Sequence, residues 1–135
     1  MIVYSATKKE FVRDVVDSQV DTRILESFVR ETGRRVGGSE VSSWRNSMQY
    51  MRNVVDTPDI PDDAGIAIEY IIPQTAKRID FIITGLNNLG QKKAVIVELK
   101  QWQEVRAVQT TDMDAVMVQT FVGGREREVL HPSYQ

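Results

Sequence analysis

The stretch that decides the fold is Lys77–Gln103, KRIDFIITGLNNLGQKKAVIVELKQWQ. It has two segments rich in β-branched residues on either side of the loop GLNNLGQ, which predicts a β-hairpin. The expected strands are residues 79–84 and 94–100. Because directly paired residues of a hairpin share a face, folding it symmetrically about Leu89 places Asp80 opposite Glu98. The Cβ atoms of such a pair lie about 4.5–5.5 Å apart.

Two carboxylates at that separation repel each other, and both interrupt otherwise apolar strands. A divalent cation explains the arrangement, because Mg²⁺ takes one or two carboxylates, keeps several waters and binds substrate phosphates. Lys100 is expected on the same side as Glu98, where it could orient or help deprotonate a metal-bound water, or hold a phosphate. This set of groups is typical of metal-assisted phosphodiester hydrolysis.

The order of Asp80, a loop and then Glu98-Leu99-Lys100 resembles the PD-(D/E)xK nuclease superfamily, with Ile79 where that family has proline. Nearly the whole chain also resembles the N-terminal nuclease-like region of a bacterial family, in which this region precedes a helicase-like P-loop ATPase. The segments that carry this second resemblance are MIVYSATKKEF, SSWRNSMQYM, IPDDAGIAIEYIIPQTAKRIDFIITG, VIVELKQW and GGREREVLHPSYQ.

The resemblance implies an α+β, restriction-endonuclease-like core that uses Mg²⁺ or Mn²⁺. Asp80 and Glu98 would hold the metal, the Leu99 carbonyl would assist, and Lys100 would position the attacking water. In this superfamily the helix before the sheet often supplies another acidic residue, and Glu40 is the candidate. A carboxylate at a helix N-terminus is also favoured electrostatically, so a purely structural role is an equal alternative.

Five further residues are candidates for the site or for substrate contact. Glu69, the lone charge of the expected strand 66–72, is either a third metal ligand or a structural partner of Lys77 or Arg78. Gln101 follows the Glu-x-Lys motif directly, and Gln135 stands where some exonuclease-type relatives carry a glutamine near the substrate. Arg125 and Arg127 alternate with glutamates in a C-terminal hairpin, where they would contact a phosphate backbone or simply pair with those glutamates.

Length and composition set broad limits. The 135 residues are expected to form a single domain, with a helical part over 1–56 and a sheet part over 64–135. The chain has no cysteine, which excludes disulfides and thiolate metal sites. A net charge of −2 argues against tight nonspecific nucleic-acid binding unless basic residues cluster locally. With no apolar run near the ~20 residues of a membrane span and no signal peptide, we expect a cytoplasmic protein without membrane contact.

Apolar stripes predict three N-terminal helices, and the resemblance implies that these pack on a mixed, mainly antiparallel sheet. Their expected caps are a capping box at 7–10, Asp21 or Thr22 for the second helix, which Gly33 ends, and Ser39 for the third, which runs to Val55. The basic loop at 34–38 is either a solvated turn or a phosphate contact.

The superfamily core has the order αβββαβ, and this chain ends where its second helix is expected. We therefore expect a shortened version that lacks the C-terminal helix, leaves one sheet face under-covered and compensates by homodimerisation. The predicted function is a metal-dependent nuclease acting on DNA rather than RNA. The alternative is a catalytically inactive nucleic-acid-binding or assembly module that works with a helicase-like ATPase.

Overall fold

The computed structural model describes residues 1–75, 77–102, 104–108, 117–122 and 124–130. These residues form two compact units, 1–99 and 100–135. The sequence predicted a single domain over residues 1–135, and this single domain stays a prediction.

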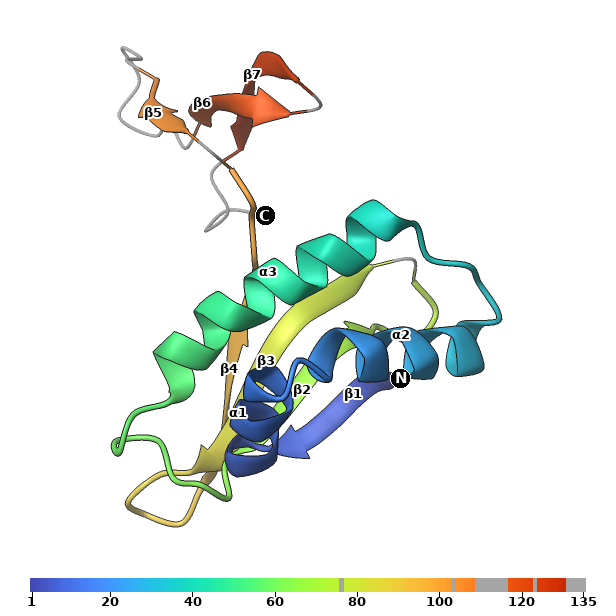
Figure 1. The fold of residues 1–135 in the computed structure, drawn as a ribbon. Helices are drawn as coiled ribbons and strands as arrows, with labels where there is room; N and C mark the ends of the chain where they lie inside the picture. Colours follow the sequence, from blue (N-terminus) through green and yellow to red (C-terminus); the bar gives the residue numbers. More distant parts are fainter. Residues whose placement is uncertain (76, 103, 109–116, 123, 131–135) are drawn as a thin grey trace. The chain divides into compact units, whose positions relative to one another are not determined.

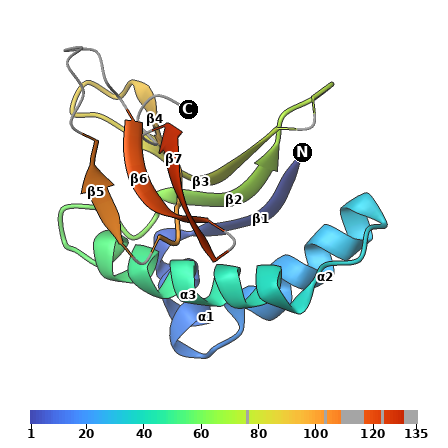
Figure 2. The same ribbon diagram turned by 90° about the horizontal axis from the view of Figure 1, so that it is seen from above.

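The first unit combines three helices with a four-stranded antiparallel sheet. Its elements, in chain order, are β1 (Ile2–Thr7), α1 (Lys8–Val16), α2 (Val20–Thr32), α3 (Gly38–Val55), β2 (Gly65–Ile71), β3 (Arg78–Leu86) and β4 (Lys92–Val97). The strand order is β1-β2-β3-β4, and every pairing is antiparallel. All three helices lie on one face of this sheet (Figure 1, Figure 2). This arrangement confirms the α+β class and the predicted packing of N-terminal helices on a sheet.

The hydrophobic core lies between the helices and this face of the sheet. Phe11 of α1 meets Phe81 of β3 edge to face, with ring centroids 5.4 Å apart, and both side chains are fully buried. The predicted stripe of α3 faces the core through Trp44, Met48, Met51 and Val55. Burial of these side chains is the main stabilising term for an amphipathic helix on a sheet.

The helix limits follow local and long-range contacts. Thr7 and Glu10 form the predicted capping box at the start of α1, and Gly33 ends α2 in a left-handed conformation. The predicted caps of α2 were wrong, because the helix begins at Val20. Asp21 lies inside its first turn, and its Oδ2 accepts hydrogen bonds from the Arg45 guanidinium at 2.6 and 2.8 Å.

The predicted cap of α3 was also wrong, since Gly37 and not Ser39 is the residue at its N-terminus. The predicted end of this helix at Val55 is confirmed. Gly37 has extended backbone angles, and its carbonyl accepts hydrogen bonds from the amides of Glu40 and Val41.

The second unit contains a three-stranded antiparallel sheet of β5 (Val105–Ala107), β6 (Met117–Val122) and β7 (Arg125–Leu130), in the order β5-β6-β7. The C-terminal hairpin of β6 and β7 was predicted, whereas the short strand β5 was not. Among the described residues, no helix has the length and apolar character needed to cross a membrane.

Candidate active site

The β3–β4 hairpin has the predicted register. Its pairs run from Phe81 with Val97 to Leu86 with Lys92 and are symmetric about the loop centre. Strand β4 ends at Val97, three residues before the predicted end. Just beyond this last pair, Oδ2 of Asp80 accepts a 2.9 Å hydrogen bond from the backbone amide of Leu99. Asp80 thus anchors the segment that carries Glu98 beside β3.

A third carboxylate belongs to the same row of the sheet. In the β2–β3 register, Glu69 lies opposite Asp80, between the pairs Ile68 with Phe81 and Tyr70 with Ile79. Continuing the β3–β4 register by one residue places Glu98 on the other side of Asp80. Glu69, Asp80 and Glu98 therefore occupy one row across β2, β3 and the residue after β4.

Glu69 has a left-handed backbone, with φ of 54°, which a residue other than glycine seldom adopts in a strand. Ideal alternation would place Ile68 and Glu69 on opposite faces of the sheet. Instead Ile68 packs in the core, and Glu69 is buried against Trp44 of α3, so both side chains lie on the helical side. Such a conformation costs about 1–3 kcal/mol and persists only where surrounding contacts hold it.

The Glu69 carboxylate is 5% exposed. Its Oε1 accepts a 2.8 Å hydrogen bond from Nε1 of Trp44. Its Oε2 lies 3.0 Å from Nη1 of Arg78 but has no hydrogen bond of suitable geometry within the described part of the chain. Burial raises the pKa of Glu69, and the charges of Asp80 and Glu40 act in the same direction, whereas Trp44 and Arg78 lower it.

Arg78 joins two of these carboxylates. Its Nη1 donates to Oε1 of Glu40 at 2.9 Å and lies 3.0 Å from Oε2 of Glu69. Burial opposes the charge of Arg78, but the hydrogen bond to Glu40 and the charges of Glu69 and Asp80 outweigh it and raise its pKa. The guanidinium also lies 5.9 Å from the ring centroid of Phe28. The structure therefore confirms the predicted Arg78 partnership of Glu69, while metal ligation by Glu69 stays a prediction.

These side chains line one small cavity of about 160 Å³, which we call the acidic pocket. Four predicted site residues line it, namely Glu40, Glu69, Asp80 and Leu99. Within the described ranges, no three acidic or histidine side chains are grouped closely enough to hold a metal ion by themselves. Sequence reasoning missed Trp44 as a site residue, because its spacing marks it only as a core position of α3.

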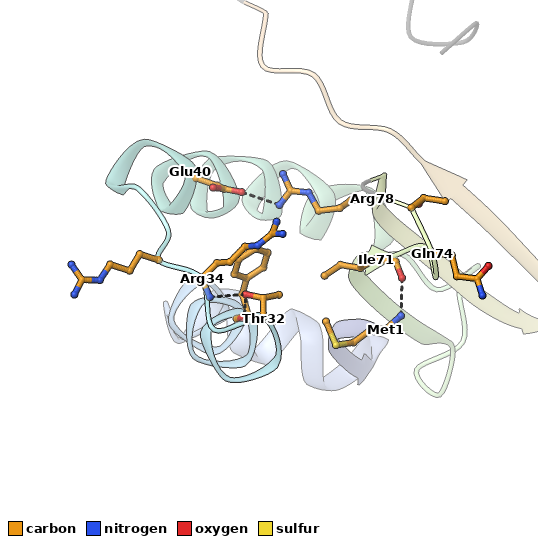
Figure 3. Close-up of a pocket in the computed structure, with 10 residues that line it drawn as sticks. Met1, Thr32, Arg34, Glu40, Ile71, Gln74 and Arg78 are labelled. Atoms are coloured by element: carbon orange, nitrogen blue, oxygen red, sulfur yellow. Dashed lines mark hydrogen bonds and ion pairs between the residues drawn. The ribbon is translucent and has the colours of Figure 1, made fainter.

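A second and larger pocket adjoins this one and shares Glu40 and Arg78 with it. Its volume is about 790 Å³, and it is also lined by Arg34 and Arg35 of the basic loop between α2 and α3. We call it the arginine pocket. Figure 3 shows Glu40 and Arg78 joined along its wall, with Arg34 and Thr32 nearby at the end of α2.

Other predicted site residues lie outside the acidic pocket. Glu98 is exposed at the end of the first unit, and Lys100 and Gln101 begin the second unit. Arg125 and Arg127 are exposed on β7. Gln135 lies outside the described residues. The roles predicted for these residues stay predictions.

Comparison of the chain with models of protein families, with curated proteins and with solved structures finds no match.

Proposed function

We propose that the chain carries a metal-dependent phosphodiesterase site of the PD-(D/E)xK type, with DNA as the expected substrate. The observation that carries this proposal is the hydrogen bond from the Leu99 amide to Asp80, which holds Glu98 and Leu99 beside β3. The order α3-β2-β3-β4 supports it, because it has the helix and three antiparallel strands with which the superfamily core begins. Asp80 lies on the second of these strands, and Glu98 follows the third.

The donor groups suit a hard divalent cation. Mg²⁺ in phosphate-processing sites needs only one or two carboxylates, because waters and substrate oxygens complete its octahedron. Asp80 and Glu98 supply that pair. Glu69 is the candidate third ligand. Its Oε2 accepts no hydrogen bond within the described residues and lies 3.0 Å from Nη1 of Arg78. When bound, Mg²⁺ or Mn²⁺ would polarise a phosphate and lower the pKa of a coordinated water.

Arg78 places one positive charge between Glu40 and Glu69 and so offsets part of their negative charge within the fold. The Leu99 amide stabilises one oxygen of Asp80 and orients the side chain. Lys100, through Nζ, would orient the attacking water or take its proton. The Leu99 carbonyl would provide an additional oxygen.

A cleavage assay tests this proposal. Linear DNA, plasmid DNA and RNA are incubated with the wild type, Asp80→Ala and Lys100→Ala in Mg²⁺ or Mn²⁺, and in EDTA. We expect metal-dependent cleavage by the wild type. Lys100→Ala removes the group that orients or deprotonates the attacking water, so its cleavage rate should fall by about 10²–10⁴-fold. Equal cleavage by wild type and Asp80→Ala would contradict the proposal.

The contacts of Arg78 favour a second candidate, the non-cleaving nucleic-acid-binding or assembly module. The guanidinium of Arg78 contacts both Glu40 and Glu69, and such a contact stabilises the fold whether or not the site is catalytic. This module would bind DNA without cutting it, and Arg125 and Arg127 are its candidate phosphate contacts. Replacing both by Gln should lower DNA affinity evenly across sequences and reduce the salt dependence by about two contacts. The helicase-like ATPase partner and the homodimer remain predictions for either candidate.

A further inference from the structure

The arginine pocket is the feature that the proposed chemistry leaves unexplained. Three arginines from two separate segments line it, Arg34 and Arg35 from the α2–α3 loop and Arg78 from the start of β3. Positive side chains that line one cavity raise its electrostatic potential, which favours a negatively charged ligand. The pocket is therefore electrostatically prepared for a negatively charged ligand.

The charges inside the pocket do not balance. Glu40 is the sole carboxylate among the described residues that line it, and its Oε1 already accepts from Arg78 at 2.9 Å. Within the described part of the chain, neither Arg34 nor Arg35 has an ion-pair partner. The guanidinium charges of Arg34 and Arg35 thus remain available. Guanidinium groups bind phosphate through paired N–H donors, which makes phosphate the ligand chemistry that these arginines suit best.

The size and the apolar wall of the pocket indicate more than a bare phosphate. A cavity of about 790 Å³ lies within the range that holds whole organic ligands, roughly 300–1,000 Å³. Phe28 and Ile71 form apolar parts of the lining, and Gln74 and Thr75 add polar groups near the turn between β2 and β3 (Figure 3). A phosphate with an attached base and sugar has both kinds of surface.

We propose that the arginine pocket binds the phosphate of a nucleotide, with Arg34 and Arg35 as its main ligands. The nucleotide is either free or the end of a nucleic-acid strand. Arg78 and Glu40 belong to both pockets, so a strand end bound here lies next to the acidic pocket. The inference rests on the proposed function only where it takes a strand as the source, because phosphate binding by arginines requires no metal at Asp80 or Glu98.

The test is isothermal titration in EDTA with three probes, thymidine, thymidine 5′-monophosphate and a 5′-phosphorylated thymidine dinucleotide. The variants are Arg34→Gln, Arg35→Gln together and a matched control, Arg30→Gln, which removes an exposed α2 arginine outside the pocket. Circular dichroism and thermal unfolding check folding. We expect the wild type and the control to bind the monophosphate about tenfold or more tightly than thymidine, and the double variant to lose about tenfold or more. Equal binding of thymidine and its monophosphate, or unchanged binding in the double variant, would overturn the proposal.

The dinucleotide separates the two sources. Tighter binding of the dinucleotide than of the monophosphate assigns the pocket to a strand end, and equal binding assigns it to a free nucleotide. Both results support the phosphate site.

Mn²⁺ titration of the same preparations distinguishes this inference from the nuclease proposal. A wild type that binds the monophosphate through Arg34 and Arg35 but binds no Mn²⁺ supports the pocket and contradicts the nuclease. A wild type that binds Mn²⁺ but no nucleotide overturns the pocket alone.

Discussion

Oδ2 of Asp80 accepts a 2.9 Å hydrogen bond from the backbone amide of Leu99, immediately after strand β4 has ended. The backbone hydrogen bonds between β3 and β4 stop at Val97. Beyond that point the bond to Asp80 holds Glu98 and Leu99 against β3. Asp80 therefore has a structural task in addition to its proposed metal-binding task. Variants at this position need to separate the two.

Asp80→Asn and Asp80→Ala make that separation. Asn retains an oxygen that can accept from the Leu99 amide but removes the negative charge, whereas Ala removes both. We expect Asp80→Ala to lose about 0.5–1.5 kcal/mol more of the unfolding free energy than Asp80→Asn, which is the usual contribution of one hydrogen bond. Both variants should lose metal-dependent cleavage. Urea denaturation and the cleavage assay measure the two effects, and wild-type cleavage by Asp80→Asn would show that the charge is dispensable.

Arg78→Gln should destabilise the first unit by about 1–3 kcal/mol, because it leaves the buried Glu69 carboxylate without its cation. Adding Glu69→Gln should recover part of the loss and give a coupling energy of about 0.5 kcal/mol or more in a double-mutant cycle. Urea unfolding is followed by Trp44 fluorescence in a Trp102→Phe background. Arg30→Gln, which removes an exposed ion pair, is the control and should change stability by less than about 0.5 kcal/mol. Equal effects of the two arginine substitutions would contradict this account.

The raised pKa of Glu69 predicts a specific pH dependence. A carboxyl whose pKa is higher in the folded state contributes stability at low pH, and this contribution is lost as the pH rises through the folded pKa. Glu69→Gln cannot titrate and so lacks this loss. The unfolding free energy of Glu69→Gln minus that of the wild type should therefore increase as the pH rises above the ordinary glutamate pKa of about 4.3. Parallel stability curves for the two proteins between pH 4 and 8 (roughly the range over which a raised carboxyl titrates) would be inconsistent with the burial of this charge.

Tyr4→Phe should cost about 1–3 kcal/mol of stability, because it leaves a buried acceptor without one of its donors. The Tyr4 hydroxyl donates to Oδ2 of Asp14 at 2.8 Å, and Asp14 is only 2% exposed. Burial and this hydrogen bond also raise the pKa of Tyr4. Tyr50→Phe is the matched control, because Tyr50 is 74% exposed and should be neutral. Thermal unfolding compares the two, and similar losses of stability would refute a particular role for the Tyr4–Asp14 contact.

The sequence was sufficient for features that depend on near neighbours. The register that places Asp80 opposite Glu98 follows from the period of a strand and the symmetry of the loop about Leu89. The capping box at Thr7 and the left-handed Gly33 likewise follow from local chemistry.

The features that sequence reasoning missed depend on distant contacts. Asp21 does not cap α2, because Arg45 on α3 holds its carboxylate. The left-handed Glu69 breaks the alternation of β2, which a strict period of two cannot anticipate, and Trp44 on α3 then binds its carboxylate. Both pockets exist only once α3 is packed over the sheet, so their shared pair, Glu40 and Arg78, was not foreseen as a pair.

The most direct test of the proposed metal site is isothermal titration of Mn²⁺ into the wild type and into an Asp80→Ala, Glu98→Ala double variant, with folding verified for both. A second double variant, Asp59→Ala, Asp63→Ala, removes two exposed loop carboxylates and controls for the change in net charge. The account predicts Mn²⁺ binding by the wild type and the loop variant, and none by the Asp80, Glu98 variant. A folded wild type that binds no Mn²⁺, or an Asp80, Glu98 variant that binds it as well as the wild type, would contradict the proposed site.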